Sequence, residues 1–436
     1  MEQQREFVFL LKQQIGIPAI PVVKISDYVM RGSLIARAVP GKICANLHSS
    51  VSGTVIKISE LSITIAADEV QTEAYVPLKG EHPLELIEAA GIVGMGGAGF
   101  PTHIKLHNKP DPDGLLIING AECEPILSHN LLRIAESPDR FLRGIRYAMD
   151  VAGVSNAVIA LKEIHRKTAS LLKDRMTSSN LRLHLLPDRY PAGEERALIR
   201  EITGNLLKVR ELPLVSNTLV LNVETVLKIL DAIELKKPVI SKDITVAGQL
   251  RHPDSIQVIK DIPIGTTVLS ALNLAGGLSC EYGELIMGGP FTGIRSDLSR
   301  PIIKTTGGII ATMPFLREKR PLGILVCACG ATESRMREIA DSMGAKICGV
   351  SYCKQAISVD NGGYKCENPG KCPGQSEKIL ELRKQGAQAL LIGNCTDCSN
   401  TVSTIASRLH MPVHHITDGS LRSVGMKLVR KIHEQL

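Results

Sequence analysis

The chain has 436 residues, of which 44% are hydrophobic and 22% charged, and its formal net charge is +7. This length exceeds one ordinary folding core, and the hydrophobic share leaves little room for long disordered tails. An aromatic content of 3%, without Trp, provides few platforms for stacking bases, which argues against nucleic-acid binding. No apolar run reaches the ~18 residues of a membrane span, and the charged start MEQQREF lacks the pattern of an export signal. We therefore expect a cytoplasmic protein without membrane insertion.

The first half of the chain divides into two predicted units. Residues 1–80 alternate short apolar stretches with Gly, Pro, Asp and Ser, as in HSSVSGTVIKI, which is typical of short strands and tight turns. Residues 81–240 predict an α/β core that begins with a helix from Leu84 to Ala90 and a glycine-rich loop from Gly91 to Phe100. The apolar stretches LLIING and NAVIAL then predict buried strands, with helices between them.

Two more units are predicted in the second half. Residues 241–320 contain DITVAGQL, VIKDIPIGTTV and ELIMGGP, which indicate a β-rich domain. Residues 321–436 alternate apolar strands such as GILV and ALLIG with polar helical segments such as ATESRMREIADSMG. This alternation is typical of a parallel sheet with helices on its faces.

A glycine-rich segment, GMGGAGFP from Gly94 to Pro101, is the first motif that indicates chemistry. Its four glycines lack a Cβ atom, so the backbone can approach a flat or phosphate-bearing ligand closely. A glycine-rich loop alone is more often a plain surface loop, and this one follows a helix and not the strand of the usual dinucleotide motif.

Two acidic motifs follow, YPAGEE from Tyr190 to Glu195 and LNVET from Leu221 to Thr225. Acids at a helix start have a simple structural explanation, because carboxylates stabilise the positive end of the helix dipole. Neither motif decides a function by itself.

Taken in their order along the chain, the motifs resemble those of a known group of proteins. GMGGAGFP with Lys105, NGAECEP, YPAGEE and NVET resemble the flavin- and NADH-binding subunit of respiratory complex I, and more closely the RnfC-like electron-transfer proteins. The resemblance implies a multidomain α/β protein. Its predicted parts are an N-terminal lipoyl-like β barrel-sandwich (1–80), a complex I flavin-subunit-like core (81–240), a soluble-ligand-binding β-grasp (SLBB) domain (241–320) and a C-terminal Cys-rich α/β domain (321–436).

The same resemblance implies the cofactors and their contacts. FMN would be held by glycine amides, Lys105 and polar side chains, and the full predicted set is Gly94, Gly96, Gly97, Lys105, Asn119, Tyr190, Gly193, Glu194, Asn222 and Thr225. NADH would approach past Phe100, Glu122, Glu124 and Glu195. Backbone amides with a lysine suit a phosphate, and carboxylates can accept hydrogen bonds from ribose hydroxyls.

Eight of the 11 cysteines lie in the last quarter of the chain, at positions 327, 329, 348, 353, 366, 372, 395 and 398. In a reducing compartment this crowding indicates metal or thiol redox chemistry more than structural disulfides. Six of them lie in or just after predicted strands, so we expect them at one edge of a parallel sheet, with Cys366 and Cys372 able to reach the same edge. Cys44, Cys123 and Cys280 are interpreted as packed thiols.

The CxxC pair Cys395–Cys398 falls at a predicted helix start, where backbone N–H groups lower the pKa of a thiol and favour dithiol–disulfide exchange. The predicted redox residues are Cys395, Cys398, Cys327, Cys329 and Cys353. A zinc site is equally compatible with this spacing. The chain lacks the CxxCxxCxxxCP runs of ferredoxin-type clusters, although an irregular iron–sulfur site stays possible.

The cysteine segments extend the resemblance. CACG, KCENPGKCPG and GNCTDC on this body resemble the electron-transfer proteins associated with D-proline reductase (PrdC) in amino-acid-fermenting anaerobes. That resemblance implies transfer of electrons from NADH, or from an Rnf-type membrane complex, through FMN and cysteines to D-proline reductase. The alternative is a zinc- or iron–sulfur-binding RnfC-like scaffold subunit without its own NADH oxidation. The sequence leaves open whether FMN binds, which cysteines pair, and the oligomeric state.

Overall fold

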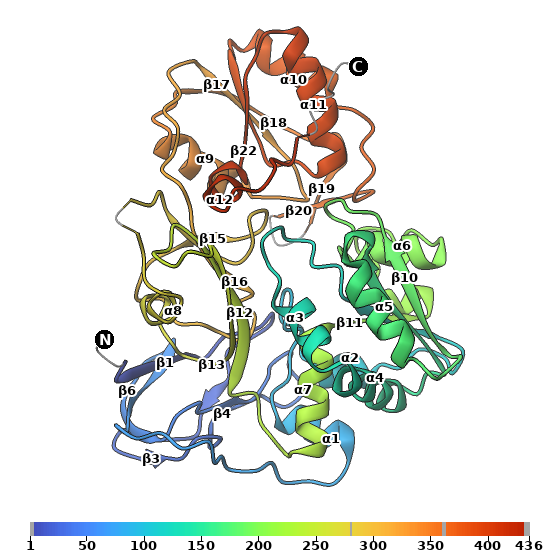
Figure 1. The fold of residues 1–436 in the computed structure, drawn as a ribbon, viewed down its shortest axis with the longest axis vertical. Helices are drawn as coiled ribbons and strands as arrows, with labels where there is room; N and C mark the ends of the chain where they lie inside the picture. The colour runs from blue at the N-terminus through green and yellow to red at the C-terminus, as the bar shows by residue number, and fades with distance from the viewer. Residues whose placement is uncertain (1–3, 280, 360–362, 431–436) are drawn as a thin grey trace.

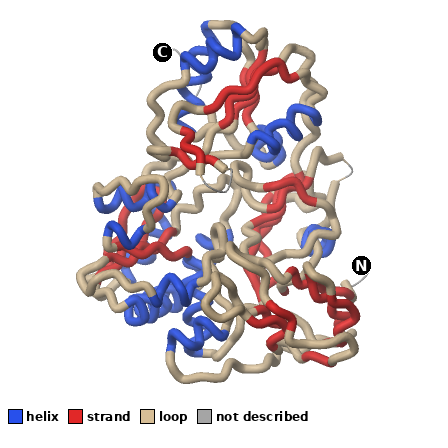
Figure 2. Tube along the Cα trace, turned by 180° about the vertical axis from the view of Figure 1, so that it is seen from behind, coloured by secondary structure: helices blue, strands red, loops and turns tan. Residues whose placement is uncertain are grey.

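A computed structural model describes residues 4–279, 281–359 and 363–430; Cys280 lies outside the described residues. Figure 1 shows four units along the chain: a blue N-terminal β unit, a green α/β core beside it, a yellow β-rich unit, and an orange-red C-terminal α/β unit at the opposite end of the molecule. The same arrangement, with helices and strands separated by colour, is visible from behind in Figure 2.

The N-terminal unit is built from two small sheets, with orders β1-β7-β6-β3 and β2-β4-β5. The strands alternate buried and exposed side chains, so that Phe9, Ile63 and Ile65 face a shared core and are fully buried. This is the predicted barrel-sandwich. Its strands are β1 (Glu6–Leu10), β2 (Ile20–Pro21), β3 (Tyr28–Val29), β4 (Leu34–Arg37), β5 (Leu47–His48), β6 (Gly53–Ile58) and β7 (Ser62–Ala67).

The α/β core has a four-stranded sheet of order β10-β9-β8-β11 in which every neighbouring pair is parallel. Its strands are β8 (Leu115–Asn119), β9 (Asn156–Lys162), β10 (Leu181–Leu186) and β11 (Thr218–Asn222). Its helices are α1 (Pro83–Ala89), α2 (Thr102–His107), α3 (His129–Glu136), α4 (Pro138–Ala152), α5 (Arg166–Arg175), α6 (Glu195–Thr203) and α7 (Val223–Glu234). The sequence patterns predicted most of these elements, but the helices α2, α3 and α7 and the strand β11 were not expected.

The third unit is a mixed sheet of order β13-β12-β16-β14-β15 that packs against helix α8 (Val268–Leu274). Strand β12 (Ser241–Gly248) is buried along its whole length, because it pairs with β13 (Ile256–Pro263) on one side and β16 (Gly308–Ala311) on the other. The remaining strands are β14 (Leu285–Met287) and β15 (Ile294–Ser296).

The C-terminal unit contains a parallel sheet of order β18-β17-β21-β22. Its strands are β17 (Leu322–Val326), β18 (Ile347–Tyr352), β21 (Ala389–Ile392) and β22 (Val413–His415). Helices α9 (Glu333–Ser342), α10 (Ser376–Lys384), α11 (Thr396–Arg408) and α12 (Asp418–Ser423) connect or follow them, and a hairpin of β19 (Ala356–Ser358) and β20 (Tyr364–Cys366) projects toward α6 (Figure 1). The predicted fold class, a multidomain α/β protein, is confirmed. The boundaries drawn between its units stay predictions.

None of the helices in the described ranges combines the length and apolarity needed to cross a bilayer.

Candidate functional site

Two asparagines meet at the end of the core sheet. Asn119 ends β8 and Asn222 ends β11, and the two residues are direct partners in the parallel register. Asn222 also caps α7, because its Oδ1 accepts a hydrogen bond of 2.8 Å from the N–H of Glu224. A Cβ atom on Gly96 would lie 2.3 Å from Nδ2 of Asn222. The glycine loop therefore lies against the edge of the sheet where polar groups of parallel strands collect.

Buried polar groups anchor the backbone of the glycine loop. The N–H of Met95 donates to Oγ1 of Thr225 at 3.0 Å, and the Met95 carbonyl accepts from Nζ of Lys242 at 3.1 Å. Lys242 is fully buried and forms an ion pair with Glu224. A buried charge is tolerated only when it is paired and hydrogen-bonded. The loop is thus an anchored element, and the simple interpretation of GMGGAGFP as a free surface loop does not describe it.

Three consecutive residues of the loop are exposed, and their backbone N–H groups are free in the part of the chain that the structure describes. Gly96, Gly97 and Ala98 are exposed, and a Cβ atom on Gly97 would meet nothing within 4 Å. Within the described residues, the N–H groups of these three residues have no protein acceptor. Consecutive free amides of the backbone can bind anions. The loop therefore has unpaired donors of the kind that bind a phosphate.

Lys105 on α2 and Glu195 on α6 form an ion pair. Nζ of Lys105 lies 3.1 Å from Oε1 of Glu195 and donates to the carbonyl of Val220 at 2.9 Å. Glu195 is the first residue of α6, at the positive end of that helix. The pair supplies a cation and an anion within reach of one ligand.

The YPAGEE segment packs against the end of strand β8. Asn119 donates from Nδ2 to the carbonyl of Gly193 at 2.8 Å, which fixes the segment to the strand end. Glu194 caps α6 through the N–H of Ala197 at 2.8 Å. Burial raises the pKa of the Glu194 carboxyl above its usual value. The structure thus brings Gly96, Asn119, Glu194 and Asn222 to one place.

The predicted acids of NGAECEP are placed differently from one another. Glu122 accepts from Nδ2 of Asn130 at 2.8 Å, and its other oxygen is buried without a partner. Glu124 accepts hydrogen bonds from the N–H of Phe291, the N–H of Thr292 and the Thr292 hydroxyl. Its carboxylate is therefore used to hold the loop that follows β14. Glu122 therefore keeps one oxygen without a protein partner, whereas both oxygens of Glu124 are used.

Phe100 lies at the far end of the glycine loop. Its carbonyl accepts a hydrogen bond of 2.9 Å from the N–H of Gly94, so the loop closes on itself. Gly94 and Phe100 thereby set the width of the open turn between them.

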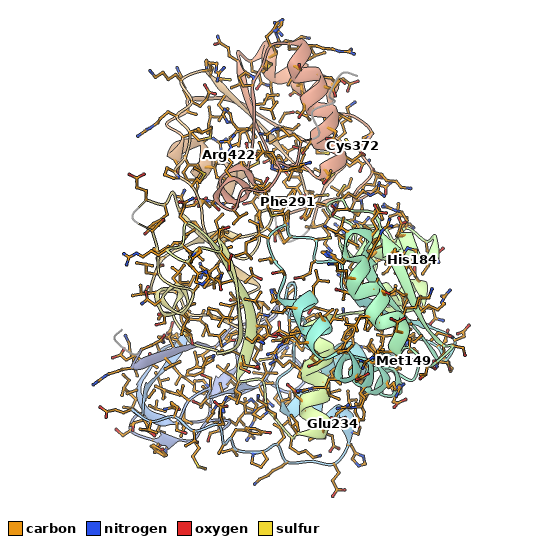
Figure 3. The ribbon with its side chains drawn as sticks, in the orientation of Figure 1. Met149, His184, Glu234, Phe291, Cys372 and Arg422 are labelled. Atoms are coloured by element: carbon orange, nitrogen blue, oxygen red, sulfur yellow. The ribbon has the colours of Figure 1, made fainter. Side chains whose placement is uncertain are left out.

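Tyr190 joins the core to the C-terminal unit. Its ring stacks on Phe291, with centroids 3.6 Å apart and planes 2° apart, and its hydroxyl donates to the carbonyl of Cys329. Both rings belong to the hydrophobic core of the C-terminal unit. Figure 3 shows Phe291 at the junction between the units. Three parts of the chain that are distant in sequence are therefore fixed against one another.

Arg196 makes a second connection between these parts. It is buried on α6 and donates from Nη1 to the carbonyl of Cys366 and from Nη2 to the carbonyl of Glu367, both at 2.6 Å. Its Nε donates to the carbonyl of Leu207 at 3.0 Å. Helix α6 thus carries Glu195 on the predicted flavin side and Arg196, which binds the β19–β20 hairpin that contains Cys366.

Seven cysteines gather at the C-terminal edge of the parallel sheet of the last unit, and we call them the thiol cluster. They are Cys327, Cys329, Cys353, Cys366, Cys372, Cys395 and Cys398, all without disulfides. Strands β17, β18 and β21 each end just before a member of the cluster, because parallel strands bring their carboxyl ends to one edge. The prediction of a shared edge is right for these residues. It is wrong for Cys348, which lies near the start of β18 and donates to the carbonyl of Leu322 at 3.4 Å.

The contacts within the thiol cluster form a chain that branches at Cys329. Cys329 forms hydrogen bonds with Cys366, Cys395 and Cys327. Cys327 also contacts Cys353. Cys398 contacts Cys353 and, on its other side, Cys372. The two thiols of the CxxC motif therefore bond to different neighbours: Cys395 to Cys329, and Cys398 to Cys353 and Cys372.

Hydrogen bonding separates the thiols by acidity. The thiols of Cys327 and Cys398 lower the pKa of Cys353 to about 3. The thiol of Cys398, the N–H of Gly374 and the Gln375 amide lower the pKa of Cys372 to about 6. The pKa of Cys398 itself is raised, because its proton is shared with these two acceptors. Hydrogen bonding therefore favours the thiolate form at Cys353 and Cys372 and the protonated form at Cys398.

Several residues of the site were missed by the sequence. Gln375 is fully buried, and its Nε2 donates to Sγ of Cys353 at 3.2 Å and lies 3.7 Å from Sγ of Cys372. Asn394 donates from Nδ2 to Sγ of Cys398 at 2.9 Å. A lone amide carries no pattern, so only the folded structure places it. Cys123, interpreted as a packed thiol, accepts from the N–H of Gly193 at 2.6 Å, and burial raises its pKa to about 11.

Across residues 4–279, 281–359 and 363–430, no three His, Cys, Asp or Glu side chains are grouped in a way that could hold a metal ion.

Comparison with known proteins identifies the family of this chain. The RnfC barrel-sandwich hybrid domain matches residues 1–76, and the Nuo51 FMN-binding domain matches residues 87–231. The C component of the proton-translocating ferredoxin:NAD(+) oxidoreductase complex from Clostridium ljungdahlii is 33% identical over 320 residues, which is 69% of this chain and 69% of that protein. The chain belongs to the RnfC family.

Several other known proteins are similar to parts of this chain. A cobalamin reductase, PduS, from Salmonella typhimurium is 37% identical over 254 residues, which cover 58% of this chain and 52% of that protein. The C component of the ion-translocating oxidoreductase complex from Pseudomonas aeruginosa is 34% identical over 70% of this chain and 42% of that protein. An NAD+-reducing [NiFe]-hydrogenase aligns in structure with a TM-score of 0.46 at 23% identity, over 52% of this chain and 46% of that chain. The chain spans about half of the PduS protein.

The chain therefore carries an FMN-binding domain of the complex I type in an RnfC-like electron-transfer framework. The individual contacts predicted for the cofactors stay predictions.

Proposed function

We propose that this protein is an electron-transfer flavoprotein that passes reducing equivalents from NADH, through FMN, to the thiol cluster. The observation that carries the proposal is the contact of Tyr190 with both sides: its segment lines the predicted flavin site, and its hydroxyl donates to the backbone of Cys329. A flavin exchanges electrons in pairs with a nicotinamide and with a dithiol, and that is the chemistry FMN would supply here.

The chain's own residues would bind and orient the cofactor. The free amides of Gly96, Gly97 and Ala98 and the cation of Lys105 suit a phosphate. Asn119 and Asn222 present amide groups at the strand ends for the polar edge of a flavin ring. Glu195 and the unpartnered oxygen of Glu122 are acceptors for ribose hydroxyls of NADH.

We further propose that the acceptor of the electrons is D-proline reductase, with NADH or an Rnf-type membrane complex as the source. Support for this partner comes from the resemblance of CACG, KCENPGKCPG and GNCTDC to the electron-transfer proteins associated with that enzyme. A thiol cluster at a sheet edge is compatible with an acceptor that is reduced by thiol exchange.

An anaerobic titration with NADH tests the proposal. The purified chain is loaded with FMN, oxidised at its thiols, and titrated while the flavin absorbance and the number of thiols that react with an aromatic disulfide are followed. We expect the flavin band to bleach and new thiols to appear as NADH is added beyond the flavin equivalent. Bleaching without new thiols would contradict transfer to the cluster, and absence of FMN binding would contradict the flavoprotein itself. Addition of D-proline reductase with proline then tests the partner, through NADH consumption that depends on both proteins.

A further inference from the structure

The contact order of the thiol cluster has an inner and an outer end. The inner end is Cys329, whose carbonyl receives the Tyr190 hydroxyl. From there the contacts run through Cys327, Cys353 and Cys398 to Cys372. Each step joins two sulfurs that already share a hydrogen bond.

Exposure distinguishes the outer end from the interior. Cys327, Cys353 and Cys398 are 3%, 8% and 1% exposed, whereas the two ends of the order, Cys329 and Cys372, are half-buried, and Cys372 lies between the exposed residues Lys371 and Pro373. Figure 3 shows Cys372 beside α11 at the side of the C-terminal unit, apart from Phe291 at the junction. The CxxC residue Cys395, which the sequence motif would select as the reactive thiol, is only 4% exposed.

The surroundings of Cys372 hold its sulfur and its backbone in place. Asp397 accepts from the N–H of Cys372 at 2.7 Å, and the N–H of Gly374 donates to the Cys372 sulfur at 3.3 Å. The low pKa of this thiol keeps it ionised at neutral pH, and the thiolate is the form that attacks a disulfide.

We propose that Cys372 is the exit nucleophile of the thiol cluster and that Cys398 is its resolving thiol, so that electrons leave to a disulfide of an acceptor through the pair Cys372–Cys398. The proposal deepens the proposed function, on which it rests for the source of electrons. It assigns the exit to a residue outside the CxxC motif, and it makes the two cysteines of that motif members of different pairs.

The reaction can be written as two exchanges. The Cys372 thiolate attacks one sulfur of the acceptor disulfide, so an S–S bond to Cys372 forms, the acceptor S–S bond breaks, and the leaving sulfur takes a proton from solvent. Cys398 then loses its proton to solvent, attacks Sγ of Cys372, and expels the second acceptor thiolate, which is protonated. The acceptor gains two electrons and two protons, and Cys372–Cys398 becomes a disulfide.

The oxidised pair is restored by exchange along the contact order. Cys353 attacks Sγ of Cys398 and expels Cys372, and Cys327 then attacks Sγ of Cys353 and expels Cys398. Attack of Cys329 on Sγ of Cys327, with expulsion of Cys353, brings the disulfide to the inner end. Each exchange breaks one S–S bond and forms another, so no electrons are lost before the two-electron donor of the proposed function reduces the final disulfide.

A trapping experiment on the flavin-free, fully reduced chain tests this assignment. One equivalent of the aromatic disulfide 5,5′-dithiobis(2-nitrobenzoate) serves as the acceptor. The unmodified chain is expected to release two thionitrobenzoate anions and to yield one disulfide between neighbouring members of the contact order that runs from Cys372 to Cys329. Cys398→Ser lacks the resolving thiol, so we expect release of one anion and a stable adduct on Cys372, located by peptide mass. The same variant would carry its adduct on Cys395 if the CxxC motif were the exit.

Two further variants keep the test decisive. Cys372→Ser is expected to slow the first release by about 10-fold or more, because the remaining thiols of the cluster are buried except Cys329, which is half-buried at the inner end. Cys348→Ser, which lies outside the cluster, is expected to react as the unmodified chain does. An adduct on Cys395, a Cys395–Cys398 disulfide, or zinc or acid-labile sulfide that blocks all thiols until chelation would each overturn the proposal. Because no flavin is present, failure here is distinguishable from failure of NADH oxidation.

Discussion

The ring of Tyr190 lies flat on the ring of Phe291, with centroids 3.6 Å apart, although the two residues belong to different units of the chain. The ring of His415 meets the Phe291 ring edge-on at a centroid distance of 5.4 Å, so aromatic groups from three units pack together. Edge-to-face aromatic contacts, such as that of His415 with Phe291, add to the free energy of burial. This stack fixes the distance between the predicted flavin site and the thiol cluster.

Phe291→Ala removes the centre of that stack. We expect the free energy of unfolding to fall by about 3 kcal/mol, because the side chain is 1% exposed and its loss leaves a cavity. Denaturant unfolding measures this change. Phe291→Leu retains most of the volume and should recover more than half of the loss. Equal stability of all three chains would show that the stack contributes nothing to the junction.

Gly97→Ala separates folding from cofactor binding. A Cβ atom at this position meets nothing within 4 Å in the protein, so the melting temperature of the flavin-free chain should stay unchanged. FMN affinity, measured by quenching of flavin fluorescence, should fall by about 10-fold or more if the ligand occupies this space. An unchanged affinity would place the cofactor elsewhere.

Gly96→Ala makes the opposite prediction for the flavin-free chain. Here the added Cβ lies 2.3 Å from Nδ2 of Asn222, so the amide that caps α7 must move. We expect a loss of about 1 kcal/mol in stability before any cofactor is added. Thermal unfolding of the two glycine variants side by side provides the comparison, and equal melting temperatures would contradict the close approach of the loop to Asn222.

Gln375→Leu tests the amide that bridges the two thiolates. Removal of its donor should raise the pKa of Cys353 and of Cys372, the latter by about one pH unit. Thiolate absorbance in the ultraviolet, followed against pH, measures both. Gln375→Glu keeps the shape but adds a negative charge, so it should raise the pKa of Cys372 further. Identical titrations would remove Gln375 from the site.

Lys304 predicts a pH dependence of stability. It is buried, donates to the carbonyls of Asn46 and Gly91, and has its pKa lowered by burial to about 7. The unfolded chain binds this proton up to a pKa of about 10.4. Between these two values the unfolded state holds more protons, so stability rises with pH by up to about 1.4 kcal/mol per pH unit and levels off below about 7.

The comparison with Lys304→Met isolates this contribution. The variant is less stable, because two carbonyls lose their donor, but it should lack this part of the slope between about pH 7.5 and about pH 9.5. Urea unfolding at several pH values gives both slopes. Parallel slopes would show that Lys304 does not titrate in this range.

The sequence predicted those features that depend on short-range patterns. The strands LLIING and NAVIAL and the helix at Glu195 were predicted because apolar periodicity and acidic helix starts are local signals. The meeting of Asn119 with Asn222 was available only through resemblance, since it depends on which strands are neighbours. Cys348 was wrongly grouped because the sequence does not show that it lies near the start of β18. Gln375 and Asn394 are single amides whose role appears only when sulfur atoms surround them.

Arg196 limits how the units of this protein can be exchanged. The guanidinium group is buried and spends its donors on the carbonyls of Leu207, Cys366 and Glu367. A chimera that joins the N-terminal part to a different electron-accepting module would leave that buried cation with the Leu207 carbonyl as its one remaining acceptor of these three, at a cost of several kcal/mol. A stable chimera would therefore need the face of α6 that bears Arg196 to be redesigned together with the new module.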